Sequence, residues 1–298
     1  MRKLAYDELR TLVALPDAGA RQALRKDLQS EGLLYCREVA ALPALRDKLK
    51  QSDADLLIIS LEEGQWDAAA LIREVRLSAV GTNPFMVIIV LLEEPTPRTV
   101  SAVVNAGADD LLLSPWLGRL LVARLDGFAR GRKPFMVTHD YIGPERRGLL
   151  REDEDAPQSI DVPNPVQWLN AGNADREAFR LKIEGALLQV NRLRIKSSGG
   201  QLRFLAELAV ERFSAGGHVA ILPTVRSLLE ASDDMVRRAA NTDYAPAIEL
   251  TSGLRVLCQR LLREKREPRQ DEIAVLPSLA GAVLDAIHLH EAEAPPAA

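Results

Sequence analysis

Residues 55–64 read DLLIISLEEG, in which an acidic residue is followed by four aliphatic residues and Ser60. A run that is apolar at every position, rather than at every second one, is typical of a strand buried on both faces of a parallel sheet. A similar run, MVIIVLL, occupies residues 86–92. The two runs together predict the centre of a parallel sheet that helices cover on both sides.

Three further apolar segments lie on either side of this centre: TLVAL (11–15), LLYCREV (33–39) and DLLL (110–113). The segments between them repeat apolar residues at i, i+3, i+4 and i+7, which is the spacing of an amphipathic helix. Strands that alternate with helices favour βαβ units, in which the strands run parallel. The sequence therefore predicts an α/β domain with a doubly wound five-stranded parallel sheet over residues 1–131.

The pattern changes after this domain. Residues 132–175 contain prolines and a charged cluster, and they predict a linker whose first half is ordered. Residues 176–290 have helical spacing throughout and predict an all-α helical bundle, with helix stops at SSGG (197–200) and AGG (215–217). Residues 291–298, EAEAPPAA, predict a disordered tail.

Composition limits the classes of function. The 298 residues carry a net charge of −4, so no chain-wide positive field attracts nucleic acid. The two cysteines, Cys36 and Cys258, lie far apart in apolar surroundings and are expected to be reduced. No stretch approaches the roughly 20 apolar residues that span a bilayer, and the start lacks the apolar core of a signal peptide. We expect a cytoplasmic protein without a membrane span.

The stretch NAGADDLLLSPW (105–116) carries a family resemblance. It resembles the A-G-A-D-D-Y-L-x-K-P-F segment of the receiver domains of two-component response regulators. The stretch DADLLIISLEEG (53–64) resembles the third strand of the same family, and the likeness extends over nearly all of residues 1–131. The resemblance implies a receiver fold and a role in two-component signalling.

Three strand ends depart from the family pattern. The last residue of the family's third strand is the aspartate that accepts a phosphoryl group, and this position is Ser60. Leu92 stands where the family has a threonine or serine that holds the phosphoryl oxygen. Ser114 stands where the family has a lysine before the proline. The resemblance thus implies a degenerate phosphoacceptor pocket.

The acidic pair that carries Mg²⁺ in the family is also missing. It aligns with Leu15 and Pro16, which leaves Asp17 one position late. Phosphoryl transfer to a carboxylate needs a carboxylate nucleophile, a metal held by hard oxygen ligands and a cation near the leaving oxygens. We therefore expect no catalytic residue, no metal and no cofactor. Four glutamates on loops at this edge leave a bound divalent cation as an alternative: Glu62, Glu63, Glu93 and Glu94.

The family docks its partners on the face made by the fourth helix, the fifth strand and the fifth helix. By position this face includes Arg98, Val104, Trp116, Arg119 and Arg124. Trp116 follows Pro115, where the family usually has an aromatic residue. It either packs beneath the fifth helix or anchors a partner.

The segment VTHDYIGPERR (137–147) holds the densest set of unusual residues. Its arginines suit bidentate contacts with carboxylates or phosphates. One interpretation is a partner-binding element; the other is a hinge in which Tyr141 and Ile142 hold the chain against the domain and Gly143-Pro144 turns it. Arg147 begins an R-x-x-x-R spacing that resembles PilZ domains, which bind a cyclic dinucleotide, but helices follow instead of strands. The candidate partner-binding residues of this segment are His139, Asp140, Tyr141, Arg146 and Arg147.

The helical segment has nearly balanced charges, and none of its histidines has the mid-helix setting of a phosphotransfer module. The leading expectation is a non-enzymatic, phosphorylation-independent signalling adaptor. Its partners are then proteins, such as a sensor kinase or a scaffold, with self-association into a homodimer as a further alternative. The competing hypothesis is an atypical DNA-binding response regulator, in which LPTVRSLLEASDDMVRRAAN (222–241) would form a helix-turn-helix.

Overall fold

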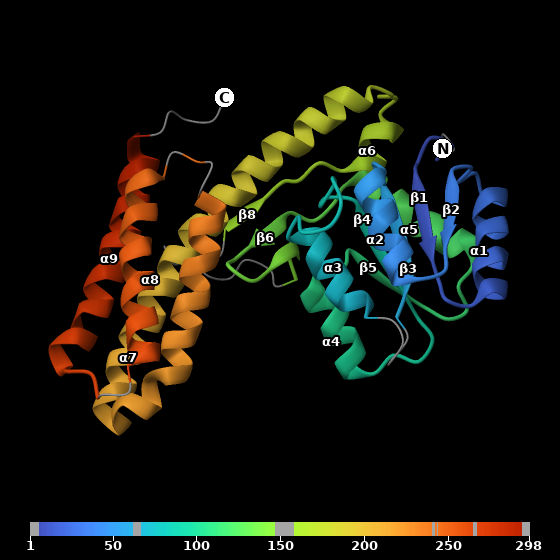
Figure 1. Cartoon of the computed structure of the whole chain (residues 1–298). Helices are drawn as coiled ribbons and strands as arrows, with labels where there is room; N and C mark the ends of the chain where they lie inside the picture. Colours follow the sequence, from blue (N-terminus) through green and yellow to red (C-terminus); the bar gives the residue numbers. More distant parts are fainter. Residues whose placement is uncertain are drawn as a thin grey trace. The chain divides into compact units, whose positions relative to one another are not determined.

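The computed structural model describes residues 6–61, 67–146, 158–239, 242, 244–264 and 267–293 (Figure 1). The chain divides into two compact units, residues 1–188 and residues 189–298. The division lies inside helix α7 (Arg176–Ala239) and so falls beyond the boundary predicted at residue 175.

The first unit contains a sheet of five parallel strands in the order β2-β1-β3-β4-β5. This is the strand order of the doubly wound folds of flavodoxin and CheY. The α/β prediction from the sequence is confirmed, and the fold is that of a receiver domain. The strands are β1 (Thr11–Ala14), β2 (Cys36–Val39), β3 (Leu56–Ser60), β4 (Val87–Leu92) and β5 (Asp110–Leu113).

Five helices cover this sheet on its two faces (Figure 1). Alternate residues of β3 divide between two cores: Ile58 packs with α1 and α5, whereas Leu57 and Ile59 pack with α2, α3 and α4. Every residue of β3 is at most 2% exposed, which is why its sequence is apolar without alternation. The helices are α1 (Ala18–Ser30), α2 (Leu42–Gln51), α3 (Ala68–Arg76), α4 (Pro97–Ala106) and α5 (Gly118–Arg130).

The predicted linker is largely folded where the structure describes it. Three short strands form an antiparallel sheet in the order β7-β6-β8, and helix α6 packs on α5 through Val166. Phe135 and Ile142 of this sheet are fully or almost fully buried. The elements are β6 (Phe135–Val137), β7 (Ile142–Pro144), β8 (Gln158–Ile160) and α6 (Pro165–Asn170). Strands of three residues are too short to show a periodicity, so the sequence pattern did not reveal them.

The second unit is the predicted all-α region. It contains the remainder of α7, α8 (Ala245–Arg263) and α9 (Gln270–Glu293). The backbone of α7 leaves the helical conformation at Gly216 and Gly217, where a stop was predicted. The stop predicted at residues 197–200 is wrong, because α7 continues through it.

The reason lies in the packing of α7 against α9. A Cβ atom added at Gly199 would lie 2.8 Å from Cδ1 of Ile287 and 3.0 Å from Cδ1 of Leu284. Glycine at this position therefore lets the two helices approach closely, and tertiary packing outweighs its low helix propensity. The buried core of the unit includes Leu202, Leu228, Leu254 and Val283.

Helix α9 bears on the expectation that no stretch of the chain is long and apolar enough to span a bilayer. Residues 270–290 are long and apolar enough, by length and composition alone, to cross a membrane. Pro277 and Asp285 interrupt the apolar run along the sequence, so this property was not evident from the sequence.

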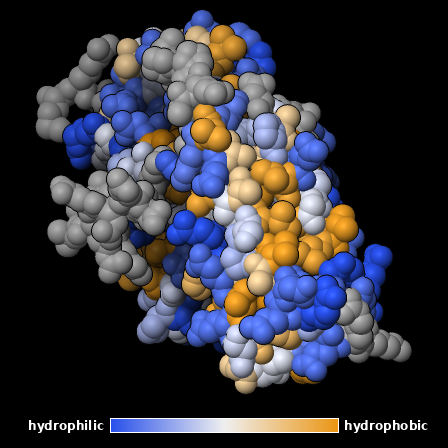
Figure 2. All heavy atoms as spheres, turned by 90° about the vertical axis from the view of Figure 1, so that its left-hand side faces the viewer, coloured by the Kyte–Doolittle hydropathy of each residue, from blue (hydrophilic) through white to orange (hydrophobic). Residues whose placement is uncertain are grey.

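Apolar side chains are also exposed on the surface. Figure 2 shows apolar residues gathered on the face of the molecule that is turned toward the viewer. The exposed large apolar side chains of the second unit are Phe204, Val219, Val256, Val275 and Leu289.

Candidate functional site

The carboxyl edge of the sheet brings three of the predicted pocket positions together. Ser60 ends β3 and Leu92 ends β4, and Ser114 follows β5. Ser60 is 2% exposed, and its Oγ has no hydrogen-bond partner in the described part of the chain. Leu92 is equally buried, whereas Ser114 is exposed and precedes Pro115 through a cis peptide bond. The side chains at these three strand ends are therefore small or aliphatic.

Asp17, the fourth predicted pocket residue, caps a helix. It is the exposed N-cap of α1, where its Oδ1 accepts a hydrogen bond of 2.6 Å from the backbone N–H of Ala20. The carbonyls of Leu15 and Pro16 accept hydrogen bonds from the guanidinium of Arg21, at 2.6 Å and 3.2 Å. A positive charge thus stands at the end of β1, where the resemblance would place acidic metal ligands.

The chemistry available at this edge is limited. The hydroxyl of Ser60 makes no hydrogen bond to a base that could activate it. Within the described ranges, no group of three or more His, Cys, Asp or Glu side chains could hold a metal ion. Glu93 and Glu94 are exposed on the loop after β4. Glu62 and Glu63 lie outside the described residues, so a cation held by these loops stays a prediction.

Trp116 is partly buried against the core that α1 and α5 share with the sheet. Its indole Nε1 donates a hydrogen bond of 3.3 Å to the carbonyl of Leu92. This contact joins the end of β4 to the segment before α5 and fits the packing interpretation. A role as a partner anchor stays a prediction.

The segment 137–147 begins as a β-hairpin between β6 and β7. Its turn lies at residues 138–141, where Thr138 and Tyr141 exchange backbone and side-chain hydrogen bonds. The turn predicted at Gly143-Pro144 is wrong, because both residues belong to β7. At the tip, Nε2 of His139 lies 3.7 Å from Oδ1 of the exposed Asp140.

The base of the hairpin is held by contacts within the unit. The hydroxyl of Tyr141 donates to the carbonyl of Pro144 at 2.9 Å, and burial raises the pKa of Tyr141. Ile142 is 3% exposed, and Arg146 donates a hydrogen bond to the carbonyl of Ala108. Arg147 lies outside the described residues. Tyr141 and Ile142 therefore hold the chain against the domain, as the hinge interpretation assumed, while a partner-binding role stays a prediction.

The two most distinctive sequence motifs meet at a pair of glycines. Gly107 of the NAGADD stretch has φ +96°, and a Cβ there would lie 2.5 Å from the carbonyl oxygen of Ile142. A Cβ at Gly143 would lie 2.7 Å from the Cα of Gly107. Only residues without side chains permit this approach of the two backbones. The hairpin is thus fixed against the start of β5.

Beside this contact lies a buried charge cluster centred on Asp109. Its carboxylate accepts hydrogen bonds from Nη2 of Arg76 at 2.7 Å and from Nε and Nη2 of Arg132 at 2.8 Å each. The backbone N–H of Ile88 donates to the same carboxylate at 2.8 Å. The side chains of Arg76, Arg132 and Asp109 are at most 3% exposed. Because β5 begins just after Asp109, this cluster lies at the amino edge of the sheet.

Neutral groups stabilise the positive charge that the one carboxylate of the cluster does not balance. Arg76 also donates to the carbonyls of Gly107 and Met86, each at 2.9 Å. The ring of Phe135 lies 5.1 Å from Cζ of Arg76 and 4.6 Å from Cζ of Arg132, within the range of cation–π attraction. Burial lowers the pKa of Arg76 to about 10, so this guanidinium is charged at neutral pH.

Sequence reasoning missed this cluster. Asp109 belongs to the quoted motif but was given no role, and Arg132 was assigned to the linker. Arg76 ends a helix of ordinary amphipathic pattern, so nothing in the sequence distinguishes it from a solvated arginine. The signal that could have revealed it is the pair Asp109-Asp110 in the motif. Successive side chains of extended backbone point to opposite faces, so one of the two carboxylates was bound to face inward.

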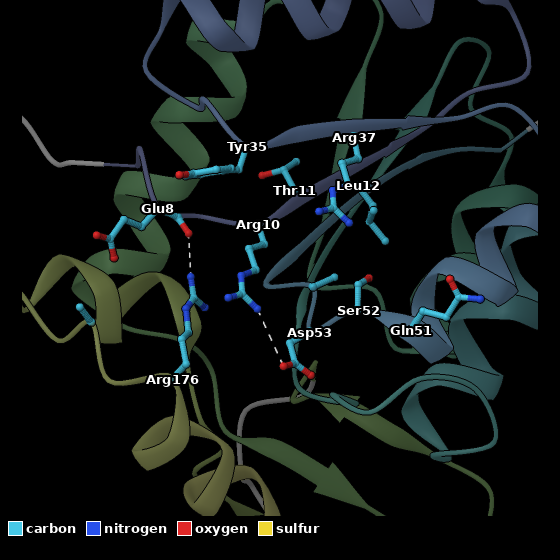
Figure 3. A pocket seen from close by; sticks show the side chains of 12 residues that line it. Glu8, Arg10, Thr11, Leu12, Tyr35, Arg37, Gln51, Ser52, Asp53 and Arg176 are labelled. Carbon is cyan, nitrogen blue, oxygen red and sulfur yellow. Dashed lines mark hydrogen bonds and ion pairs between the residues drawn. The ribbon is translucent and has the colours of Figure 1, made fainter.

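A second feature of the amino edge is a pocket of about 650 Å³ beside β1 and β2 (Figure 3). Three arginines line it: Arg10, Arg37 and Arg176. Nη1 of Arg176 lies 2.8 Å from both carboxylate oxygens of Asp55, and its Nη2 donates to the carbonyl of Glu8 at 2.7 Å. These bonds fasten the start of α7 to the sheet.

The charges of this pocket are nearly balanced. Nη1 of Arg10 lies 3.8 Å from Asp53, and the Glu8 carboxylate also lines the pocket. Burial raises the pKa of Asp55, and the N–H of Arg10 and the charge of Arg176 oppose that shift. We assign no ligand to the pocket, because its polar groups largely satisfy one another.

Comparison with known proteins gives similarity to solved structures only. No family model matches the chain, and no curated protein matches it. HP1043, an orphan response regulator of H. pylori, has 19% sequence identity, with 41% of this chain and 96% of that chain covered at a TM-score of 0.35.

Two further structures give similar values. Chemotaxis protein CheY4 of Vibrio cholerae has 20% identity, with 39% of this chain and 95% of that chain covered at a TM-score of 0.35. The isolated receiver domain of RcsB from Salmonella enterica has 23% identity, with 41% of this chain and 89% of that chain covered at a TM-score of 0.35. The fold assignment rests on the strand order and the helix layers of the first unit.

Proposed function

We propose that this chain is a non-enzymatic signalling adaptor that acts in the cytoplasm through protein–protein contacts, independently of phosphorylation. The observation that carries the proposal is the carboxyl edge of the sheet, where Ser60, Leu92 and Ser114 end or follow three adjacent strands. A carboxylate that could accept a phosphoryl group stands at none of these positions.

Electrostatics at the end of β1 support the same proposal. A bound Mg²⁺ needs hard oxygen ligands, usually with negative charge. The carbonyls of Leu15 and Pro16 are instead occupied by the guanidinium of Arg21, whose Nε also lies 3.2 Å from Glu38. A divalent cation at this place would meet a fixed positive charge.

The added hairpin supports a role in binding. Receiver folds bind through their surface, and this unit has a surface that the fold itself does not require: the sheet of β6, β7 and β8. Two glycines and the charge cluster around Asp109 fix the hairpin rigidly to the unit. A rigid added surface favours a preformed binding element, because less conformational entropy is lost on association.

The DNA-binding alternative has less support. The segment 222–239 is one continuous helical stretch of α7, and its residues Val225, Leu228 and Met235 are buried in the core. A helix-turn-helix needs a turn within such a segment. Arg237 and Arg238 at its end both pair with Asp234, which reduces the positive charge available for phosphates.

The test exposes the full chain to acetyl phosphate and Mg²⁺ and measures its intact mass. We expect no phosphoryl adduct on the wild type or on the matched variant Ser60→Ala, whereas a receiver domain that keeps the family's aspartate gains one. An adduct on the wild type that Ser60→Ala abolishes would make Ser60 a phosphoacceptor and refute the proposal. An adduct that persists in the variant would show that a residue other than Ser60 accepts the phosphoryl group. That result would also refute phosphorylation independence.

A further inference from the structure

An open groove of about 510 Å³ lies along the second half of α5, beside the start of β5 and the end of β7. It belongs to the first unit, and the hairpin forms one of its walls through Pro144 and Arg146. Of the residues of the family's docking face, it shares Arg124. The cationic residues that line it are Arg124, Arg130, Arg132, Lys133 and Arg146.

The groove carries an excess of positive charge. Two of its cations are compensated: Arg132 pairs with the buried Asp109, and Nε of Arg124 lies 3.4 Å from Asp110. The other three are Arg130, Lys133 and Arg146, which are exposed and have no carboxylate partner among the described residues. An anionic ligand would gain Coulomb energy here without breaking an existing ion pair.

The groove is also shaped before any ligand binds. The hydrogen bond from Arg146 to the Ala108 carbonyl fixes this guanidinium at one wall. Gly127 and Gly131 lie on the α5 side, and a Cβ atom added at either would meet nothing within 4 Å. The floor of the groove beside these two glycines is therefore open and free of side chains.

We propose that this groove binds an acidic segment of a partner protein, in which two or more Asp or Glu carboxylates reach the guanidinium of Arg146 and the cations of Arg130 and Lys133. The assignment rests on the proposed adaptor function and adds the chemistry of the partner. Arginine forks pair with carboxylates through two parallel hydrogen bonds.

Charge distinguishes a peptide from nucleic acid as the occupant. Sequence-independent binding to DNA depends on roughly 6–10 phosphate contacts in the stronger cases. Among the residues that the structure describes, three cations of the groove are uncompensated, and the chain carries a net charge of −4. A short acidic peptide matches this number of charges, and a duplex does not.

The test titrates the full chain into a fluorescein-labelled octapeptide of alternating glutamate and glycine and follows fluorescence anisotropy at physiological salt, about 0.15 M. A peptide with glutamine in place of glutamate and a DNA duplex of similar length serve as comparison ligands. We expect the glutamate peptide to bind, the glutamine peptide not to bind, and Arg130→Glu with Lys133→Glu to weaken binding about tenfold or more. Both substituted residues are exposed, so the variant should fold, and circular dichroism checks this.

A matched control reverses two charges elsewhere on the same unit. Lys48→Glu with Lys50→Glu changes the charge equally but lies outside the groove, on the exposed side of α2. We expect this control to bind the glutamate peptide within about twofold of the wild type, since the Debye length at physiological salt is only about 8 Å.

Three results would overturn the assignment: equal binding of the glutamine peptide, unchanged binding by the groove variant, or loss of binding in the control variant alone. Tighter binding of the duplex than of the peptide, lost in the groove variant, would make the groove a nucleic-acid contact and would also overturn it. The titration contains no phosphodonor. A phosphoryl adduct in the mass experiment would therefore refute the proposed function without changing the peptide result. Failure of the peptide to bind would overturn the groove assignment without changing the mass result.

Discussion

The two edges of the sheet in the first unit differ in their charged groups. At the carboxyl edge, β3 ends in Ser60 and β4 ends in Leu92, and both of these buried side chains are uncharged. At the amino edge, Asp109 binds two buried arginines and the hairpin packs against Gly107. The difference teaches that the charged groups that hold this receiver fold to its added hairpin gather at the amino edge, away from Ser60 and Leu92.

The largest predicted effect is at the amino edge. Asp109→Asn removes the carboxylate that compensates two buried guanidinium groups, and we expect a loss of about 3–5 kcal/mol in the free energy of unfolding of the first unit. Urea denaturation followed by circular dichroism measures it. The matched control is Asp110→Asn, since the side chain of Asp110 is 28% exposed and its pair with the half-exposed Arg124 spans 3.4 Å. We expect this control to lose less than about 1 kcal/mol. Equal losses in the two variants would contradict the central role of Asp109.

An intermediate effect is expected at the contact between the two motifs. Gly107→Ala places a Cβ on a backbone with φ +96° and 2.5 Å from the Ile142 carbonyl oxygen. We expect a loss of about 1–3 kcal/mol in the free energy of unfolding.

The control for this variant is Gly185→Ala in α7. A Cβ at Gly185 meets nothing within 4 Å, and its φ lies outside the left-handed range. Alanine is favoured over glycine in a helix by about 0.5–1 kcal/mol, so the control should be stabilised. Stabilisation of both variants would show that the hairpin does not need the close glycine contact.

The smallest effect is expected at the carboxyl edge. Ser60→Ala removes a buried hydroxyl that has no hydrogen-bond partner in the described part of the chain. We expect the free energy of unfolding to stay the same or to rise by up to about 1 kcal/mol, because an unsatisfied buried polar group is lost. A clear decrease, measured by the same urea denaturation, would mean that the hydroxyl does have a partner and that this edge is not inert.

The sheet could be predicted from sequence because its signal is local. The uninterrupted apolar runs of β3 and β4 identified the centre, and the motif at 105–116 identified the family resemblance. The resemblance implied a receiver fold, and the order of the strands came from the structure. Ser60, Leu92 and Ser114 could be placed at one edge because the carboxyl ends of parallel strands lie side by side.

The amino edge could not be predicted, because its partners are brought together only by tertiary structure. Arg76 and Asp109 are 33 residues apart, and Asp109 and Arg132 are 23 residues apart. The continuation of α7 through residues 197–200 was likewise hidden, since Gly199 is explained by its contact with Ile287. A single sequence does not distinguish a glycine that ends a helix from a glycine that lets two helices pack closely.

The bond between Arg176 and Asp55 has a consequence for biosynthesis. The two residues are 121 positions apart, and Asp55 is almost fully buried in the folded unit. As the chain leaves the ribosome, Arg76 precedes Asp109 and Arg132 follows it by 23 residues, whereas the partner of Asp55 emerges only with the start of α7. A chain ending at Gly131, where the receiver-like domain was predicted to end, would lack Arg132, Phe135 and Arg176. The first unit therefore reaches its native charge balance late in translation, after the whole sheet has been made.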